Sequence, residues 1–227
     1  MPLKVLDNPL LKHKLNAIRD KRTSPERLRG LVEELTLMCI PYLMEDAPIR
    51  RERIETPFEE GIFEFIEEDK IVLLCILRAG VPMLNGALRA LPKAKAGFLA
   101  IRRDEESLKP TLYYRRIPNI KDKWVVVLDP MLATGGTLKM ALEEIKTGRP
   151  ERIFSLHLVA SPEGIERVLF FTSRCEPVCC KRRQRIKPKG LHSAGRRGYG
   201  RQAFLVNILN ILRWVQRNAF LVPYFKP

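Results

Sequence analysis

The sequence lacks any apolar run long enough to cross a membrane as a helix. Its longest apolar stretches are residues 71–77 and 203–212, whereas a membrane-spanning helix needs about 20 such residues. The opening residues, Met-Pro-Leu-Lys, do not contain the apolar segment that is typical of a secretory signal peptide. We therefore expect a soluble, cytoplasmic protein that is not bound to a membrane.

Cysteines are few, and their spacing does not suggest a metal site. The chain has five, and no two of them form a Cys-x-x-Cys pair: Cys39, Cys75, Cys175, Cys179 and Cys180. The sequence therefore predicts neither a zinc ribbon nor a disulfide framework. With 227 residues, of which 45% are hydrophobic and 30% charged, the chain is not of the disordered class and is long enough to bury a core.

Positive charge is concentrated in the carboxyl-terminal part of the chain. The whole chain has a formal net charge of +15. Residues 172–227, here called the basic tail, hold 13 of the 41 lysines and arginines but only one acidic residue, Glu176. Residues 1–171 hold 28 basic and 25 acidic residues and are nearly neutral. A high positive charge is typical of nucleic-acid binding, but here only the basic tail carries it.

Strand and helix patterns alternate along residues 1–171. The continuous apolar run 71–77 is typical of a strand that is buried on both faces of a parallel sheet. Further strands are expected over residues 97–101, 124–128 and 152–159, a strand with one exposed face over 62–66, and half of a hairpin over 112–116. Helices are expected from Ser24 to Pro41, over 81–91 and 137–146, and from Ser161 onward. This alternation predicts an α/β fold, in which ligands bind at the loops after the carboxyl ends of the strands.

Two loops follow such strands. The first is Leu-Arg-Ala-Gly at residues 77–80, and the second is Asp-Pro-Met-Leu-Ala-Thr-Gly-Gly-Thr at residues 129–137. In the second loop, Gly135 and Gly136 allow the backbone to approach a ligand and to turn its N–H groups inward. The dipole of the following helix adds positive potential where a phosphate would lie. For the nine-residue loop as a whole, a phosphate site is favoured over a plain turn with a capped helix.

Side chains of the second loop add to this interpretation. Thr134 and Thr137 supply hydroxyl donors. Asp129 would repel a phosphate, so it needs a different partner. Ribose hydroxyls suit it, because they donate hydrogen bonds to a carboxylate.

The loop at residues 129–137 resembles the phosphoribosyl-diphosphate (PRPP) signature of type I phosphoribosyltransferases. Its residue sequence, together with Ile-Leu-Arg-Ala-Gly at residues 76–80, is similar to that of the uracil phosphoribosyltransferases. Three further segments, 12–15, 103–108 and 160–164, also match, and the resemblance covers about residues 3–170. It implies a type I phosphoribosyltransferase-like parallel sheet flanked by helices, with a hairpin or hood element.

The resemblance also implies an activity and a set of binding residues. The enzyme would transfer the phosphoribosyl group of PRPP to uracil, yielding UMP and pyrophosphate in pyrimidine salvage. Asp129 would bind the ribose hydroxyls, and Arg78, Ala79, Gly80 and Arg103 would meet the pyrophosphate. The rest of the PRPP site would be the remaining loop residues, of which Leu132 onward would hold the 5′-phosphate: Pro130, Met131, Leu132, Ala133, Thr134, Gly135, Gly136 and Thr137.

Other implications concern the metal and the partners. Mg²⁺ would be bound through PRPP oxygens, with no protein side chain as its ligand. No side chain is nominated as a covalent nucleophile. A homodimer or higher homo-oligomer is typical of the family, and GTP is left open as an effector. For Arg103, which lies beside Asp104, a solvated surface ion pair is the alternative.

The basic tail departs from the family. Uracil phosphoribosyltransferases bind uracil through a segment of the form GYIxPGxGDxGDRxF, and nothing in residues 172–227 matches it. When the codons allowed for residues 178–204 are read from their second base, however, the shifted frame permits FVAxVDKGLNPKGYIVPGAGDMGDRLF. Few amino acids are available at each shifted position, so a match of this length argues against coincidence.

We therefore hypothesise a one-base frameshift, in the gene or in its recorded sequence, shortly before Val178 and near residues 171 and 172. The predicted organisation is a phosphoribosyltransferase domain at 1–171 and an out-of-frame basic tail at 172–227. The uracil-binding residues then remain unknown, PRPP binding could survive, and the chain as written is expected to transfer little or no uracil.

Two alternatives remain open at this stage. One is an RNA-binding regulator on the same fold, with tail arginines such as Arg182 and Arg196 contacting phosphates. The tail has few aromatic residues for base stacking before Trp214, and a frameshift accounts for its charge, so nucleic acid is not expected as a partner. The other alternative is a phosphoribosyltransferase for another base, because the base-selecting segment cannot be read.

Overall fold

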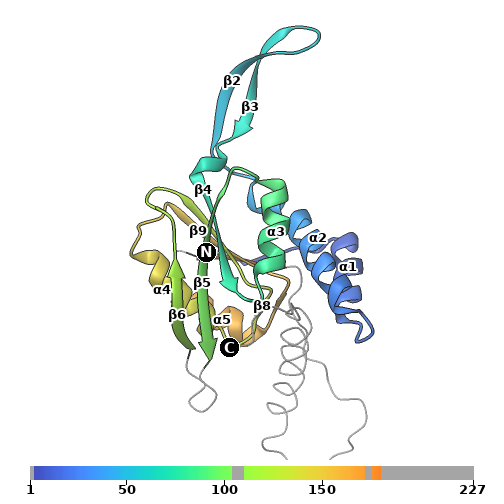
Figure 1. Ribbon diagram of the computed structural model, residues 1–227, viewed down its shortest axis with the longest axis vertical. Coiled ribbons are helices and arrows are strands. Elements are labelled where there is room, and N and C mark those ends of the chain that lie inside the picture. Colours follow the sequence, from blue (N-terminus) through green and yellow to red (C-terminus); the bar gives the residue numbers. More distant parts are fainter. Residues whose placement is uncertain (1–2, 104–109, 172–174, 180–227) are drawn as a thin grey trace, which may run out of the picture.

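A seven-stranded sheet forms the centre of the computed structural model, which describes residues 3–103, 110–171 and 175–179 (Figure 1). Its strands are β1 (Lys4–Val5), β4 (Ile71–Leu77), β5 (Lys95–Arg103), β6 (Pro110–Arg116), β7 (Trp124–Leu128), β9 (Arg152–His157) and β11 (Cys175–Cys179). They follow the order β1-β11-β9-β7-β4-β5-β6. Only the β5–β6 pair is antiparallel among these neighbours. The predicted α/β class with a mainly parallel sheet is confirmed.

Helices cover both faces of this sheet (Figure 1). They are α1 (Pro9–Arg19), α2 (Pro25–Leu43) and α3 (Val81–Ala90) on one face, and α4 (Gly136–Lys146) and α5 (Pro162–Phe171) on the other. Strand β4 explains why its sequence is apolar without a break. Ile71, Leu73 and Cys75 point into the core beneath α2 and α3, whereas Val72, Leu74 and Ile76 point into the core beneath α4. Both faces are buried, as predicted for a strand of this kind.

The start of α2 is confirmed, but its predicted end is wrong. The Ser24 hydroxyl accepts a hydrogen bond from the Arg27 N–H at 3.2 Å, and the helix begins at the following proline. It does not end at Pro41 but continues to Leu43. Proline removes one hydrogen-bond donor from the last turn, but Ile40 and Leu43 are buried in the core and their packing keeps the turn helical.

An antiparallel hairpin projects from the end of the sheet at which β4 begins (Figure 1). Its strands are β2 (Ile49–Glu55) and β3 (Glu60–Ile66), and the short 3₁₀ helix η1 (Glu68–Lys70) connects it to β4. The prediction that residues 62–66 bury one face is wrong. Ile62 is 67% exposed on one face, while Phe63 and Phe65 are 39% and 36% exposed on the other. Most of the strand lies beyond the sheet, and only Ile66, at its end next to the sheet, packs against the core.

No helix within the described ranges is both long and apolar enough to span a bilayer.

Candidate active site

The two loops singled out in the sequence meet at the carboxyl ends of β4 and β7. These strands are parallel neighbours, with Cys75 opposite Leu128. Gly80 lies where the first loop enters α3. A Cβ atom at this glycine would be 2.5 Å from the Leu128 carbonyl oxygen and 2.9 Å from that of Ile76. The absence of a side chain therefore allows the first loop to pack directly against the strand that leads into the second.

The second loop turns sharply before α4. Residues Met131–Leu132 form the short strand β8, which pairs in parallel with β10 (Val159–Ala160). Gly135 then adopts a left-handed conformation with φ of 76°, which glycine enters without the steric cost that a side chain imposes. As the N-cap of α4, Gly135 has no side chain to accept hydrogen bonds from the first helical turn. This helix start is suited to an external anion.

Carbonyl oxygens of the second loop bond to the segment 157–167. The Asp129 carbonyl lies 2.7 Å from His157 Nδ1, and the Thr134 carbonyl accepts from Arg167 at 3.0 Å. The Pro130 carbonyl accepts from the Leu158 and Val159 N–H groups. The Leu132 carbonyl accepts from the Ser161 N–H, and the Ala133 carbonyl from the Ser161 hydroxyl.

This arrangement fixes the direction of the loop's N–H groups. In a trans peptide, the carbonyl and the following N–H point in opposite directions. The carbonyls of Leu132, Ala133 and Thr134 point toward the segment 157–167, so the next N–H groups, up to that of Gly135, point away from it. Together with the first turn of α4, they form a donor-rich curve that fits a phosphate group.

Arg78, Ala79 and Arg103 occupy different settings. Arg78 directly follows β4 and is exposed, whereas Ala79 is partly buried. Arg103 is the last residue of β5, and its side chain lies outside the description, as do the adjoining residues 104–109. Asp129 is partly buried at the end of β7. The backbone thus gathers the first loop, Asp129 and the phosphate-fitting curve at one edge, while the segment expected to select uracil lies outside the described residues.

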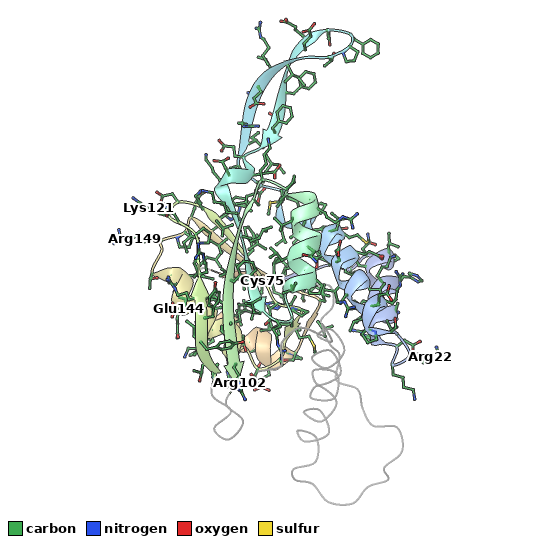
Figure 2. The ribbon with its side chains drawn as sticks, in the orientation of Figure 1. Arg22, Cys75, Arg102, Lys121, Glu144 and Arg149 are labelled. Atoms are coloured by element: carbon green, nitrogen blue, oxygen red, sulfur yellow. The ribbon has the colours of Figure 1, made fainter. Side chains whose placement is uncertain are left out.

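Cys75 lies beneath both loops and is not suited to act as a nucleophile. Its side chain, labelled in Figure 2, has no solvent exposure. Burial, with a contribution from the nearby Asp129 carboxylate, raises the pKa of its thiol to about 12. Because the thiolate is the reactive form of cysteine, this residue is inert at neutral pH.

Metal-binding side chains do not cluster at this edge. Within the described part of the chain, no three His, Cys, Asp or Glu side chains are grouped so that they could hold a metal ion.

His157 is the residue at this edge that sequence reasoning did not select. It ends β9, has no solvent exposure, and contacts the backbone of Asp129. Burial lowers the pKa of its imidazole to about 4. The sequence did contain a signal for this residue, because a histidine lies at the carboxyl end of a central strand, one strand from the Asp129 loop.

The buried imidazole predicts a loss of stability in mild acid. The unfolded chain takes up a proton near pH 6.5, whereas folded His157 does so only near pH 4, so stability falls as the pH drops between these values. We expect His157 alone to lower the free energy of unfolding by about 3 kcal/mol over this range. Urea unfolding of the wild type and of His157→Asn at a series of pH values measures it. Parallel pH dependences of the two proteins would contradict the expectation.

Comparison with known proteins now settles the family. The family model for uracil phosphoribosyltransferase (UPRTase) matches residues 5–200. The chain belongs to the uracil phosphoribosyltransferase family. The resemblance first seen in residues 76–80 and 129–137 is thereby confirmed.

Individual relatives agree with this assignment. A uracil phosphoribosyltransferase of Aquifex aeolicus is 39% identical over 203 residues, which are 89% of this chain and 98% of the relative. One from Anoxybacillus flavithermus is 39% identical over 165 residues, covering 72% of this chain and 79% of the relative. Among solved structures, the AQ2163 protein of Aquifex aeolicus superposes with a TM-score of 0.78 at 41% identity, covering 83% of this chain and 91% of the other.

Proposed function

We propose that this protein, in its intact reading frame, transfers the phosphoribosyl group of PRPP to a ring nitrogen of uracil and releases pyrophosphate. The observation that carries the proposal is the loop 129–137. Its carbonyls bond to the segment 157–167, and its N–H groups point away from that segment, next to a carboxylate. Family membership supplies the chemistry that this geometry would serve.

Each part of PRPP has a proposed partner. The Asp129 carboxylate accepts hydrogen bonds from the ribose hydroxyls, and the loop from Leu132 to Thr137 binds the 5′-phosphate. Arg78, the backbone of Ala79 and Gly80, and Arg103 bind the pyrophosphate. Mg²⁺ carried on the PRPP oxygens would neutralise part of the pyrophosphate charge.

The proposed reaction is a substitution at the anomeric carbon of the ribose. The bond from this carbon to the pyrophosphate oxygen breaks, and the oxygen keeps the electron pair. A nitrogen of uracil forms the new bond and loses its proton. Positive charge develops on the sugar during the exchange, as in glycoside hydrolysis. The protein would hold the donor in place, bind the leaving group through arginine and exclude water.

Isothermal titration calorimetry with Mg²⁺–PRPP tests the donor site. We expect saturable heat on titration into the 227-residue protein. Orthophosphate at the same concentrations is the control, because it matches only part of the site and should bind far more weakly. A folded sample that gives no heat with PRPP would contradict the proposed function. The same titration with GTP tests whether this nucleotide binds as an effector.

We also propose a homodimer that is held partly through the β2–β3 hairpin. A two-stranded hairpin by itself is marginally stable in water, but this one extends away from the sheet and exposes Phe58 at 96%, Ile62 at 67% and Phe65 at 36%. Apolar side chains that are exposed at the tip and on both faces of a hairpin mark a surface that another chain can enclose. A second copy of the chain would cover them. Cys39, Cys75 and Cys179 are buried thiols that form no disulfide, which suits the reducing cytoplasm.

Removing the apolar side chains of the hairpin should separate the dimer. We expect Phe58→Ser, Ile62→Ser and Phe65→Ser, combined in one protein, to sediment as a monomer in analytical ultracentrifugation at concentrations where the wild type is dimeric. Glu52→Gln, which changes a partly exposed polar residue on β2 that pairs with Arg50, should leave the dimer intact. A wild type that remains monomeric at every concentration would exclude this interface.

A further inference from the structure

His157 is fixed by geometry in one tautomer. Its Nδ1 lies 2.7 Å from the carbonyl oxygen of Asp129. A carbonyl oxygen can only accept a hydrogen bond, so Nδ1 must carry the proton. The other ring nitrogen, Nε2, is buried and has no hydrogen-bond partner among the described residues. A charged imidazolium would place a second N–H there, and burying it without a partner is costly. The ring is therefore neutral, with its proton on Nδ1.

This hydrogen bond acts where the second loop leaves β7. The Asp129 N–H bonds to the Leu156 carbonyl at 3.3 Å, a longer contact than that from His157. The next residue, Pro130, has no N–H to donate. The Asp129 carbonyl is thus held by the imidazole at the point where the chain changes from strand to loop, and the direction of the Asp129 side chain depends on that backbone.

The immediate neighbours of His157 are apolar. Leu156 and Leu158 on either side are buried, as is Cys179, which is its register partner on β11. An apolar side chain would satisfy the packing of such a position, so the imidazole is explained by the hydrogen bond that it makes.

We propose that His157 is a positioning residue for PRPP: its Nδ1–H holds the Asp129 carbonyl and so aims the Asp129 carboxylate at the ribose hydroxyls. This inference rests on the proposed function, because it assigns Asp129 to the ribose. His157 itself does not contact the substrate. Its effect on PRPP passes through the backbone of Asp129.

Three substitutions at this position separate the hydrogen bond from packing. His157→Asn keeps a side-chain N–H close to the place of Nδ1, His157→Gln moves its N–H further out, toward the place of Nε2, and His157→Leu fills the space with no donor. Calorimetric titration with Mg²⁺–PRPP is the readout. We expect His157→Leu and His157→Gln to raise the Kd about tenfold, the effect of one hydrogen bond to a buried carbonyl, and His157→Asn to remain within about twofold of the wild type.

Ile153→Val is the matched control. It removes one methyl group from a buried residue of the same strand, at the end away from the loop. It should lower the thermal unfolding temperature and leave the Kd for PRPP unchanged. If His157→Leu binds PRPP as tightly as the wild type, or if Asn and Leu weaken binding equally, the positioning role is overturned.

The tautomer can be tested without PRPP. Long-range ¹H–¹⁵N spectra of the wild type should place the His157 proton on Nδ1 and show a neutral ring at pH 7. A proton on Nε2 would overturn the inference even where PRPP binds. A wild type with the expected tautomer and no PRPP binding would instead contradict the proposed function. The two failures are therefore distinguishable.

Discussion

Restoring the reading frame of the basic tail should increase the rate of phosphoribosyl transfer to uracil by ~10³ or more. A site that is built to hydrogen-bond its substrate favours that substrate over an analogue without those groups by about 10⁴–10⁵, and the chain as written lacks such a site for uracil. The 227-residue chain has no match to the segment that binds uracil in the family. The codons allowed for residues 178–204 permit one in the shifted frame. Release of pyrophosphate from PRPP in the presence of uracil measures the difference between the two proteins.

The control for this comparison is the donor itself. Both proteins should bind Mg²⁺–PRPP with similar Kd values, since the loops 77–80 and 129–137 precede the tail. Equal uracil transfer by the two proteins would refute the frameshift hypothesis. Sequencing of the gene across codons 168–205 gives an independent result, because an intact frame without an insertion or deletion would also refute it.

Strand β11 refines where we propose that the frame changes. Residues Cys175–Cys179 lie in the central sheet, between β1 and β9, and Val178 and Cys179 are buried. Cys175, Glu176 and Pro177 precede the shifted match, which begins at Val178, and they pair in register with β9, as residues in the correct frame would. We therefore propose that the change lies close to Val178, and not near residues 171 and 172. The phosphoribosyltransferase domain would then include β11.

Asp129→Asn should have the second largest effect. The carboxylate is proposed to accept two hydrogen bonds from the ribose, and charged acceptors form stronger bonds than neutral ones. An amide keeps one oxygen but replaces the other with a donor, which would face a hydroxyl. We expect the Kd for PRPP to rise about 100-fold, from hydrogen bonds to a charged group that contribute about 1.5–3 kcal/mol each.

Asp46→Asn provides the control for Asp129→Asn. It removes the same charge from an exposed side chain that pairs with Arg152 at 3.7 Å, at the start of β9 and not at its carboxyl end. PRPP binding should be unchanged in this protein. If both substitutions weaken binding to the same extent, the effect is one of net charge, and Asp129 does not contact the ribose.

The sequence predicted the parts of the fold whose residues face the core on both sides. The apolar run at β4 and the loop between β7 and α4 have local signals that tertiary packing does not override. Residues 62–66 could not be interpreted correctly, because their alternation is that of a half-buried strand although only Ile66 reaches the core. Pro41 failed as a helix end because packing outweighed a local rule.

The sequence could indicate candidate residues for the site, but not the hydrogen bonds that hold the backbone of its loop. The types and spacing of Gly135 and Asp129 indicate a ligand-binding loop. His157 and Ser161 do not, since their contacts with the carbonyls of Asp129 and Ala133 join positions 28 residues apart. Only the fold brings such residues together.

One consequence follows from the way the loop's carbonyls are bound. All of the partners that we described for them lie at or before Arg167, so the proposed PRPP loop is supported by residues that precede the tail. If the gene produces the chain as written, its product would take up the activated sugar without consuming it. Such a protein would act as a sink that competes with every other enzyme that uses the same sugar.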